Sequence, residues 1–158
     1  MKQLPVGIAD FETIVKRNCV YADKTRLLYN LVRLRKPYFL ARPRRFGKSL
    51  LVSALAAILR GQRELFKGLW IDGSDYDWKP NPIIQLSFGG IESESVERLE
   101  SGLTRDIMAI AKSESLSLLG SSPVELFKSL FEELYAKYNR KVAVLIDEYD
   151  TPILRRIE

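Results

Sequence analysis

The chain has 158 residues, of which 46% are hydrophobic and 28% are charged, and this composition is typical of one globular domain with a buried core. It contains no histidine and one cysteine, Cys19, which excludes histidine-based catalysis, an internal disulfide and the usual zinc ligands. The net charge is +5, and the basic stretch over residues 33–48 indicates an anionic partner.

The hydrophobic pattern contains no segment suited to a membrane. No apolar run reaches the roughly 18 residues of a spanning helix, and the N-terminus lacks the apolar core of a signal peptide. We therefore expect a cytoplasmic protein without a membrane partner. Cys19 lies in an apolar stretch, so a buried structural thiol is expected there.

Periodicity in the first third of the chain predicts helices around one strand. Two short helical pieces are expected on either side of Cys19, the second over Lys24–Leu34 with Asp23 as its cap. The apolar run Tyr38–Ala41 predicts a buried parallel strand. A basic loop follows, and then a helix that begins at about Lys48 and ends near Gly61.

The rest of the chain again alternates between strand-like and helix-like patterns. The elements expected there are, in chain order, a helical turn within 64–71, a loop over 72–82, a strand at 83–88 ended by two glycines, an amphipathic helix at 94–113, a helix opened by Pro123, and a central strand at 142–146.

Strands that alternate with helices favour an α/β fold. The connections imply a mostly parallel sheet covered by helices on both faces, which is a three-layer α/β/α arrangement. Ligands of such sheets bind beyond the carboxyl ends of the strands. The basic loop and the pair Asp147-Glu148 both follow predicted strands, so both are expected at that edge.

The basic loop has the residues that hold a triphosphate. Gly47 would permit close approach of the backbone, Lys48 would neutralise the outer phosphate oxygens, and Ser49 would ligate Mg²⁺. The consensus P-loop has a glycine where this chain has Arg42, and the alternative is a basic loop in which Gly47 only starts a helix. The predicted nucleotide-binding residues are Arg42, Pro43, Arg44, Arg45, Phe46, Gly47, Lys48, Ser49 and Leu50.

Two acidic residues complete the expected site. Asp147 is predicted to fix Mg²⁺ through water or through the Ser49 hydroxyl, and Glu148 to orient and deprotonate the attacking water. The alternative is a pair of solvated acids at a strand end. The candidate catalytic residues are therefore Glu148 and Lys48, and the candidate metal ligands are Ser49 and Asp147.

Four segments in order resemble the AAA-ATPase-like family, which is found mainly in bacteria and some archaea. They are 4–8 (LPVGI), 21–25 (YADKT), 42–49 (RPRRFGKS) and 145–152 (LIDEYDTP). The family's phosphate loop is typically written RPRRFGKS, so Arg42 follows the family pattern. The resemblance implies a P-loop ATPase with an extra strand between the two Walker strands and a catalytic glutamate. Members often carry a C-terminal nuclease-like domain of the PD-(D/E)XK type.

We expect residues 1–158 to form the N-terminal part of a single P-loop domain. A helical lead-in over 1–36 would precede an incomplete nucleotide-binding core over 37–158, truncated after the Walker B strand. The missing strand would lie between the strands at 38–41 and 142–146, so the chain alone would bind ATP–Mg²⁺ weakly and hydrolyse it poorly.

Other functions and partners are left open. The main alternative is a non-hydrolysing nucleic-acid-binding module that uses the basic stretch at 33–48. A P-loop small-molecule kinase is disfavoured, because it needs no glutamate placed for attacking water. A nucleic acid or a protein effector bound through a missing C-terminal region, and a homo-oligomer, remain open as partners.

Overall fold

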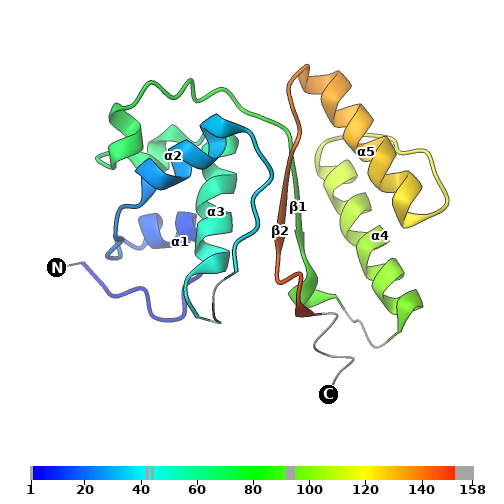
Figure 1. Ribbon diagram of the computed structural model, residues 1–158, viewed down its shortest axis with the longest axis horizontal. Coiled ribbons are helices and arrows are strands. Elements are labelled where there is room, and N and C mark those ends of the chain that lie inside the picture. Colours follow the sequence, from blue (N-terminus) through cyan, green and yellow to red (C-terminus); the bar gives the residue numbers. More distant parts are fainter. Residues whose placement is uncertain (1, 42, 44, 92–94, 152–158) are drawn as a thin grey trace. The chain divides into compact units, whose positions relative to one another are not determined.

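The computed structural model describes residues 2–41, 43, 45–91 and 95–151. It divides the chain into two compact units, an N-terminal unit (residues 1–80) and a C-terminal unit (residues 81–158). Figure 1 traces the elements of each unit in chain order. No helix among the described residues is both long and apolar enough to cross a membrane.

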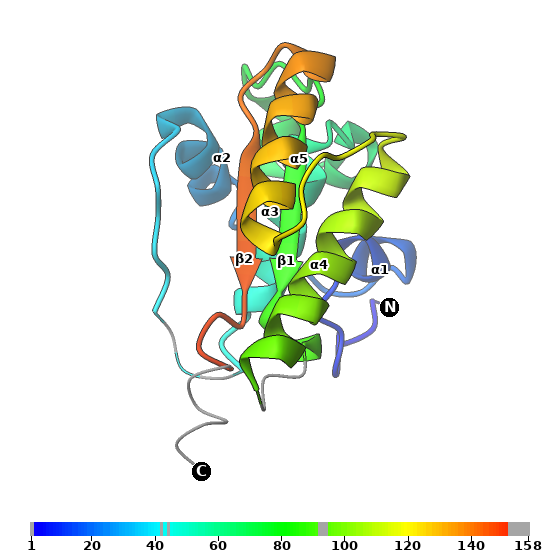
Figure 2. The same cartoon turned by 90° about the vertical axis from the view of Figure 1, so that its right-hand side faces the viewer.

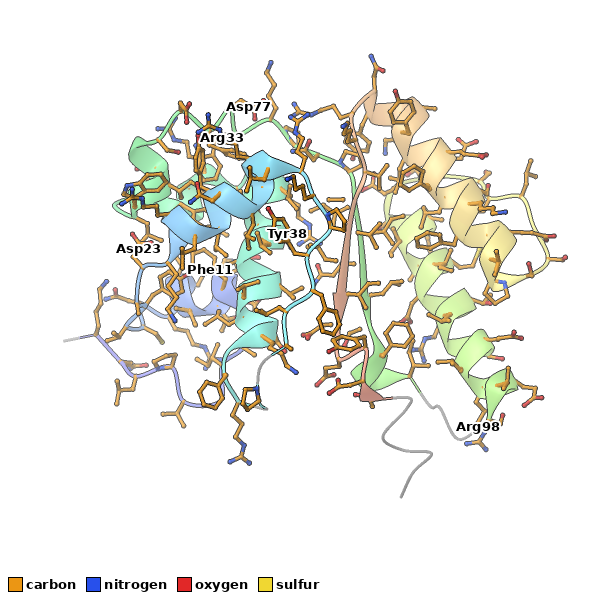
Figure 3. The ribbon with its side chains drawn as sticks, in the orientation of Figure 1. Phe11, Asp23, Arg33, Tyr38, Asp77 and Arg98 are labelled. Atoms are coloured by element: carbon orange, nitrogen blue, oxygen red, sulfur yellow. The ribbon has the colours of Figure 1, made fainter. Side chains whose placement is uncertain are left out.

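The N-terminal unit consists of helices packed around α3. Its elements are α1 (Phe11–Lys16), α2 (Thr25–Leu34), α3 (Lys48–Leu59) and the short 3₁₀ turns η1 (Arg63–Phe66) and η2 (Trp70–Gly73). Apolar residues occupy nearly every face of α3, which is the pattern of a helix surrounded by other elements. Phe11, labelled in Figure 3, is fully buried and stacks on Phe66 with ring centroids 4.7 Å apart.

The start of α2 is fixed by the segment 21–25, one of the four that resemble the family. Asp23 accepts hydrogen bonds from the backbone N–H and the hydroxyl of Thr25, at 2.8 and 2.7 Å. Its other oxygen accepts the backbone N–H of Trp70 at 2.7 Å. The N-cap position of α2 is Lys24 and has no side-chain cap bond, so Asp23 is not the cap that the sequence predicted. Asp23 instead binds the first residue of the helix and ties it to η2.

The expected strand Tyr38–Ala41 is not a strand in the structure. Tyr38, labelled in Figure 3 on the segment between α2 and α3, is 51% exposed, and Phe39 is 73% exposed. A strand exists only through hydrogen bonds to a neighbouring strand, and the named strands of the described residues both belong to the C-terminal unit. The apolar pattern was therefore insufficient to predict a strand, because it does not show whether a neighbouring strand is available for pairing.

The C-terminal unit is a two-stranded parallel sheet with two helices on one face. Its elements are β1 (Ile83–Ser87), the turn η3 (Phe88–Gly90), α4 (Val96–Ser113), α5 (Pro123–Tyr138) and β2 (Ala143–Asp147). The strands pair in register from Ile83 with Ala143 to Ser87 with Asp147. Parallel neighbours need a long crossover, and α4 and α5 provide it. Figure 2 shows both helices in front of the strands.

The core of this unit lies between the sheet and the two helices. Its buried residues are Ile84, Leu86, Ile107, Ala111, Leu126, Leu130 and Leu134. The helix opened by Pro123 begins as expected, with a capping box in which Ser122 and Glu125 exchange hydrogen bonds. At the other end Lys137 and Tyr138 both bond to Glu114, which joins the C-terminal ends of α5 and α4.

The described residues thus form an α/β structure with a small parallel sheet. This confirms the α/β class and the parallel pairing that the sequence predicted. Within the described residues β2 has one hydrogen-bonded neighbour, β1, so it is not the central strand that its apolar sequence predicted. Val144 and Ile146 are accordingly part-exposed. The buried thiol predicted for Cys19 is confirmed.

Candidate nucleotide-binding site

The N-terminus of α3 is built around Gly47. This glycine has φ 72° and ψ 27°, and its carbonyl accepts the backbone N–H of Leu51 at 3.0 Å, the first bond of the helix. A side chain in this left-handed conformation costs about 1–2 kcal/mol. A Cβ at Gly47 would meet no atom within 4 Å, so the backbone conformation and not a lack of space requires glycine here.

The first turn of α3 is left open to an anion. No side chain caps this helix among the described residues, and its first turn contains no Asp or Glu. By contrast, α1, α4 and α5 begin with Asp10, Ser95 and Ser122, each of which accepts a backbone N–H of its own helix, whereas α2 resembles α3 in having no cap bond and no acid in its first turn. The N–H groups and the positive end of the dipole of α3 can therefore serve a negatively charged ligand.

The loop residues before α3 have distinct surroundings. Arg45 is left-handed like Gly47, with φ 68°, and Phe46 is 63% exposed. Lys48 and Ser49 are half-buried in the first turn. The side chain of Leu50 packs against the core of the N-terminal unit and anchors the loop. Pro43 is exposed, whereas the predicted site residues Arg42 and Arg44 lie outside the described residues.

A side-chain contact that the sequence analysis missed holds α3 against α1. The hydroxyl of Ser53, in the second turn of α3, donates to Asp10 at 2.9 Å and accepts the backbone N–H of Phe11 at 2.9 Å. Asp10 also caps its own helix by accepting the N–H of Thr13. The cap is visible in the sequence as an Asp before a helical pattern, but the partner 43 residues away is not.

The acidic pair lies at the carboxyl end of β2. Asp147 is the last residue of that strand, and its carboxylate accepts the backbone N–H of Glu148 at 2.9 Å. Glu148 follows with φ 52°, and its carboxylate accepts the hydroxyl of Ser87 at 3.5 Å. Ser87, which was not singled out from the sequence, ends β1 in register with Asp147.

The predicted site residues therefore form two sets, one in each unit. Gly47, Lys48 and Ser49 share the first turn of α3 in the N-terminal unit. Asp147 and Glu148 share a strand end in the C-terminal unit, together with Ser87. Across the described residues, no group of three Cys, Asp or Glu side chains could hold a metal ion without further ligands.

Comparison with known proteins assigns the family. A family model described as "Predicted AAA-ATPase" matches residues 5–158, which include both sets of site residues. The chain belongs to this predicted AAA-ATPase family. The family resemblance seen in the four segments is thereby confirmed. The family's description is that of a predicted ATPase, an enzyme that uses ATP.

One relative aligns with almost the whole chain. The Azotobacter chroococcum mcd 1 protein called "Uncharacterized protein in vnfD 5'region" is 34% identical over 155 residues, which cover 97% of this chain. The chain spans 30% of the length of that relative. No solved structure matches the chain.

Proposed function

We propose that this chain binds ATP–Mg²⁺ and is the nucleotide-binding part of an ATPase. One observation carries the proposal: α3 begins without a side-chain cap, directly after the left-handed Gly47, with Lys48 and Ser49 in its first turn. This is the backbone arrangement that favours phosphate at a helix N-terminus. The family description supports the same nucleotide. We assign the nucleotide-binding core to 37–158, with 1–36 as a helical lead-in.

The loop and the first turn of α3 bind the phosphates in this proposal. The backbone N–H groups of 47–50 donate to phosphate oxygens, and the ammonium of Lys48 neutralises the outer ones. Phe46 and Pro43 shape the loop, and the arginines Arg42, Arg44 and Arg45 add positive charge along it. The absence of an acid from the first turn of α3 fits an anionic ligand.

The donor set also fits Mg²⁺. This ion takes oxygen ligands and is usually bound in proteins by one or two side chains together with substrate phosphates. The hydroxyl of Ser49 and the carboxylate of Asp147 are oxygen donors of that kind. When bound, the ion supplies positive charge that stabilises the charge of the transferring phosphoryl group.

Glu148 has the role of general base. Its carboxylate accepts the proton of the water that attacks the terminal phosphorus, and the bond from that phosphorus to the bridging oxygen of ADP breaks. Lys48 stabilises the negative charge on the outer phosphate oxygens. Asp147 holds the backbone of Glu148 through the bond to its N–H, so the two acids act in different ways. The proposed reaction is hydrolysis of ATP in the whole protein.

Titration of the chain with ATP–Mg²⁺ tests the binding site. Loss of a charge-assisted contact costs about 1.5–3 kcal/mol, so Lys48→Ala should weaken ATP affinity about 10- to 100-fold. Lys67→Ala removes the same charge from an exposed position of the same unit and should change affinity little. Equal affinities of the wild type and Lys48→Ala would refute the site.

Hydrolysis is tested in the whole protein. Glu148→Gln should retain ATP binding and lose about 10²- to 10⁴-fold in kcat, the range for removal of a general base. Asp147→Ala should weaken the Mg²⁺ dependence of ATP binding. If Glu148→Gln hydrolyses ATP at the wild-type rate, the role given to Glu148 is wrong.

A nucleic-acid-binding module is the second candidate, and the charge distribution favours it. The N-terminal unit has 16 Lys and Arg against 7 Asp and Glu, whereas the C-terminal unit has 9 against 13. Arg33, labelled in Figure 3, and Arg35 are exposed on the basic stretch 33–48. DNA binding that weakens steeply with salt and is indifferent to ATP would support this candidate over the first.

A further inference from the structure

The carboxylate of Glu148 lies directly against the α-carbon of Gly89. Gly89 belongs to η3, the turn that follows β1. A Cβ built on it would overlap the oxygen Oε2 of Glu148 and would lie 2.5 Å from the carboxyl carbon Cδ. The three nearest atoms to such a Cβ all belong to Glu148. Any residue larger than glycine at position 89 would therefore displace this carboxylate.

The backbone gives no other reason for glycine at this position. Gly89 is not among the glycines with positive φ, so an alanine could adopt its conformation. The next residue, Gly90, also lacks a positive φ, and a Cβ there would meet nothing within 4 Å. The space beside the two adjacent glycines thus differs, because the Glu148 carboxylate lies over Gly89 and nothing lies within 4 Å of a Cβ on Gly90.

Ser87 contacts the same carboxylate from the end of β1. Its hydroxyl donates to Oε2 of Glu148 at 3.5 Å, across 61 residues of sequence. The parallel register pairs Ser87 with Asp147, the residue before Glu148, and so places the hydroxyl beside that side chain. The hydrogen bond is long and exposed, so it contributes little to the stability of the fold.

The turn after β2 directs Glu148 toward this position. Glu148 has φ 52°, a conformation that costs a side-chain-bearing residue about 1–2 kcal/mol. Its N–H donates to Asp147, and its carbonyl accepts the N–H of Thr151 at 3.0 Å. These two bonds hold the left-handed turn. Sparsely populated backbone conformations held by their surroundings are frequent where a side chain must be positioned for function.

We propose that Gly89 and Ser87 are positioning residues for Glu148. Gly89 leaves the space that the carboxylate occupies, and the Ser87 hydroxyl sets the orientation of Oε2. The inference rests on the proposed role of Glu148 in ATP hydrolysis. Neither residue belongs to the phosphate loop, so their loss should lower kcat while ATP binding stays unchanged. A displacement of about 1 Å in a catalytic group costs up to about 100-fold in rate.

The test compares Gly89→Ala with the matched control Gly90→Ala. In the whole protein, Gly89→Ala should lower kcat about 10- to 100-fold, with KM within about twofold of wild type. The thermal unfolding midpoint should change little, because the clash involves the end of a flexible side chain. Gly90→Ala should leave kcat, KM and the midpoint near their wild-type values.

Ser87 provides an independent comparison. Ser87→Ala should lower kcat, and Ser87→Thr, which keeps a hydroxyl and suits a strand, should restore most of it. A role confined to packing would predict no rescue by the hydroxyl. If Ser87→Ala and Ser87→Thr have the same kcat, the Ser87 hydroxyl does not position Glu148.

A second readout separates this inference from the proposed function. The side-chain carboxyl carbon of Glu148, observed by NMR in the labelled chain, should shift in Gly89→Ala and Ser87→Ala but not in Gly90→Ala. If the wild-type protein fails to hydrolyse ATP, the proposed function is wrong, and this signal still tests the contact. An unchanged signal in Gly89→Ala, or wild-type kcat in that variant, would overturn the inference.

Discussion

Replacement of Thr25 by valine tests how the family segment 21–25 stabilises the N-terminal unit. Thr25 is fully buried, and its hydroxyl donates to Asp23 at 2.7 Å and accepts the backbone N–H of Ile71 at 3.1 Å. Thr25→Val keeps the volume of the side chain and removes both bonds. Asp23 retains the backbone N–H groups of Thr25 and Trp70 as partners.

The size of the effect follows from these partners. Loss of the bond to the carboxylate costs about 1.5–3 kcal/mol, and the N–H of Ile71, left buried without an acceptor, adds about 1–3 kcal/mol. The extra methyl group of valine returns about 0.8 kcal/mol. We expect Thr25→Val to lower the free energy of unfolding by about 2–5 kcal/mol. Thr25→Ser keeps the hydroxyl and should cost only about 1 kcal/mol for the lost methyl group.

Tryptophan fluorescence during urea unfolding measures this difference. The two tryptophans, Trp70 and Trp78, both belong to the N-terminal unit, so their emission reports the unfolding of that unit. With m of about 2 kcal/mol/M, Thr25→Val should lower the midpoint by about 1–2.5 M. A midpoint for Thr25→Val equal to or above that of Thr25→Ser would show that the hydroxyl bonds do not stabilise this unit.

Two further predictions concern the same unit. Gly47→Ala and Gly68→Ala both place a side chain at positive φ in open space, so each should lower the free energy of unfolding in urea by about 1–2 kcal/mol. Only Gly47→Ala should also weaken ATP binding. Equal ATP affinities of the two variants would count against the site. Burial opposes ionisation of Asp23, but hydrogen bonds from Trp70 and Thr25 hold the pKa of that carboxyl below its usual value of 3.8. Since the folded-state pKa is the lower one, this stabilisation is present above the unfolded pKa and is lost as pH falls through the folded pKa. The urea midpoint measured by fluorescence should therefore decrease as the pH is lowered below about 4, and this decrease should be smaller in Asp23→Asn. If Asp23→Asn has the same dependence of the midpoint on pH as the wild type, Asp23 is not the group responsible.

Much of the local structure follows from the sequence. The helix α4 and the strands β1 and β2 lie within one or two residues of their expected limits, because long amphipathic or apolar runs carry a strong periodic signal. The helix α5 begins at Pro123, as expected. The helix α3 begins at Lys48, as the Gly47-Lys48-Ser49 pattern predicts. Gly47 and the first turn are adjacent in sequence, so this half of the candidate site needs only local information.

Long-range pairing is where the sequence was insufficient. The residues at 38–41 have the composition of a strand, yet strand formation depends on a neighbour that composition does not report. Within α2, Leu27 is 62% exposed, whereas its neighbours Leu28 and Tyr29 are buried. A helix face is decided by what packs against it, and α2 is oriented by the bonds of Asp23 to η2.

The amino-acid sequence by itself determined the α/β class, the family, and the residues expected to carry nucleotide chemistry. Only the tertiary structure brought Ser53 to Asp10, Trp70 to Asp23, and Ser87 with Gly89 to Glu148. These partners are 43 to 61 residues apart, so no periodic or motif signal connects them. The contact at Glu148 arises because β1 and β2 pair in parallel register, which brings the ends of both strands to one edge of the sheet.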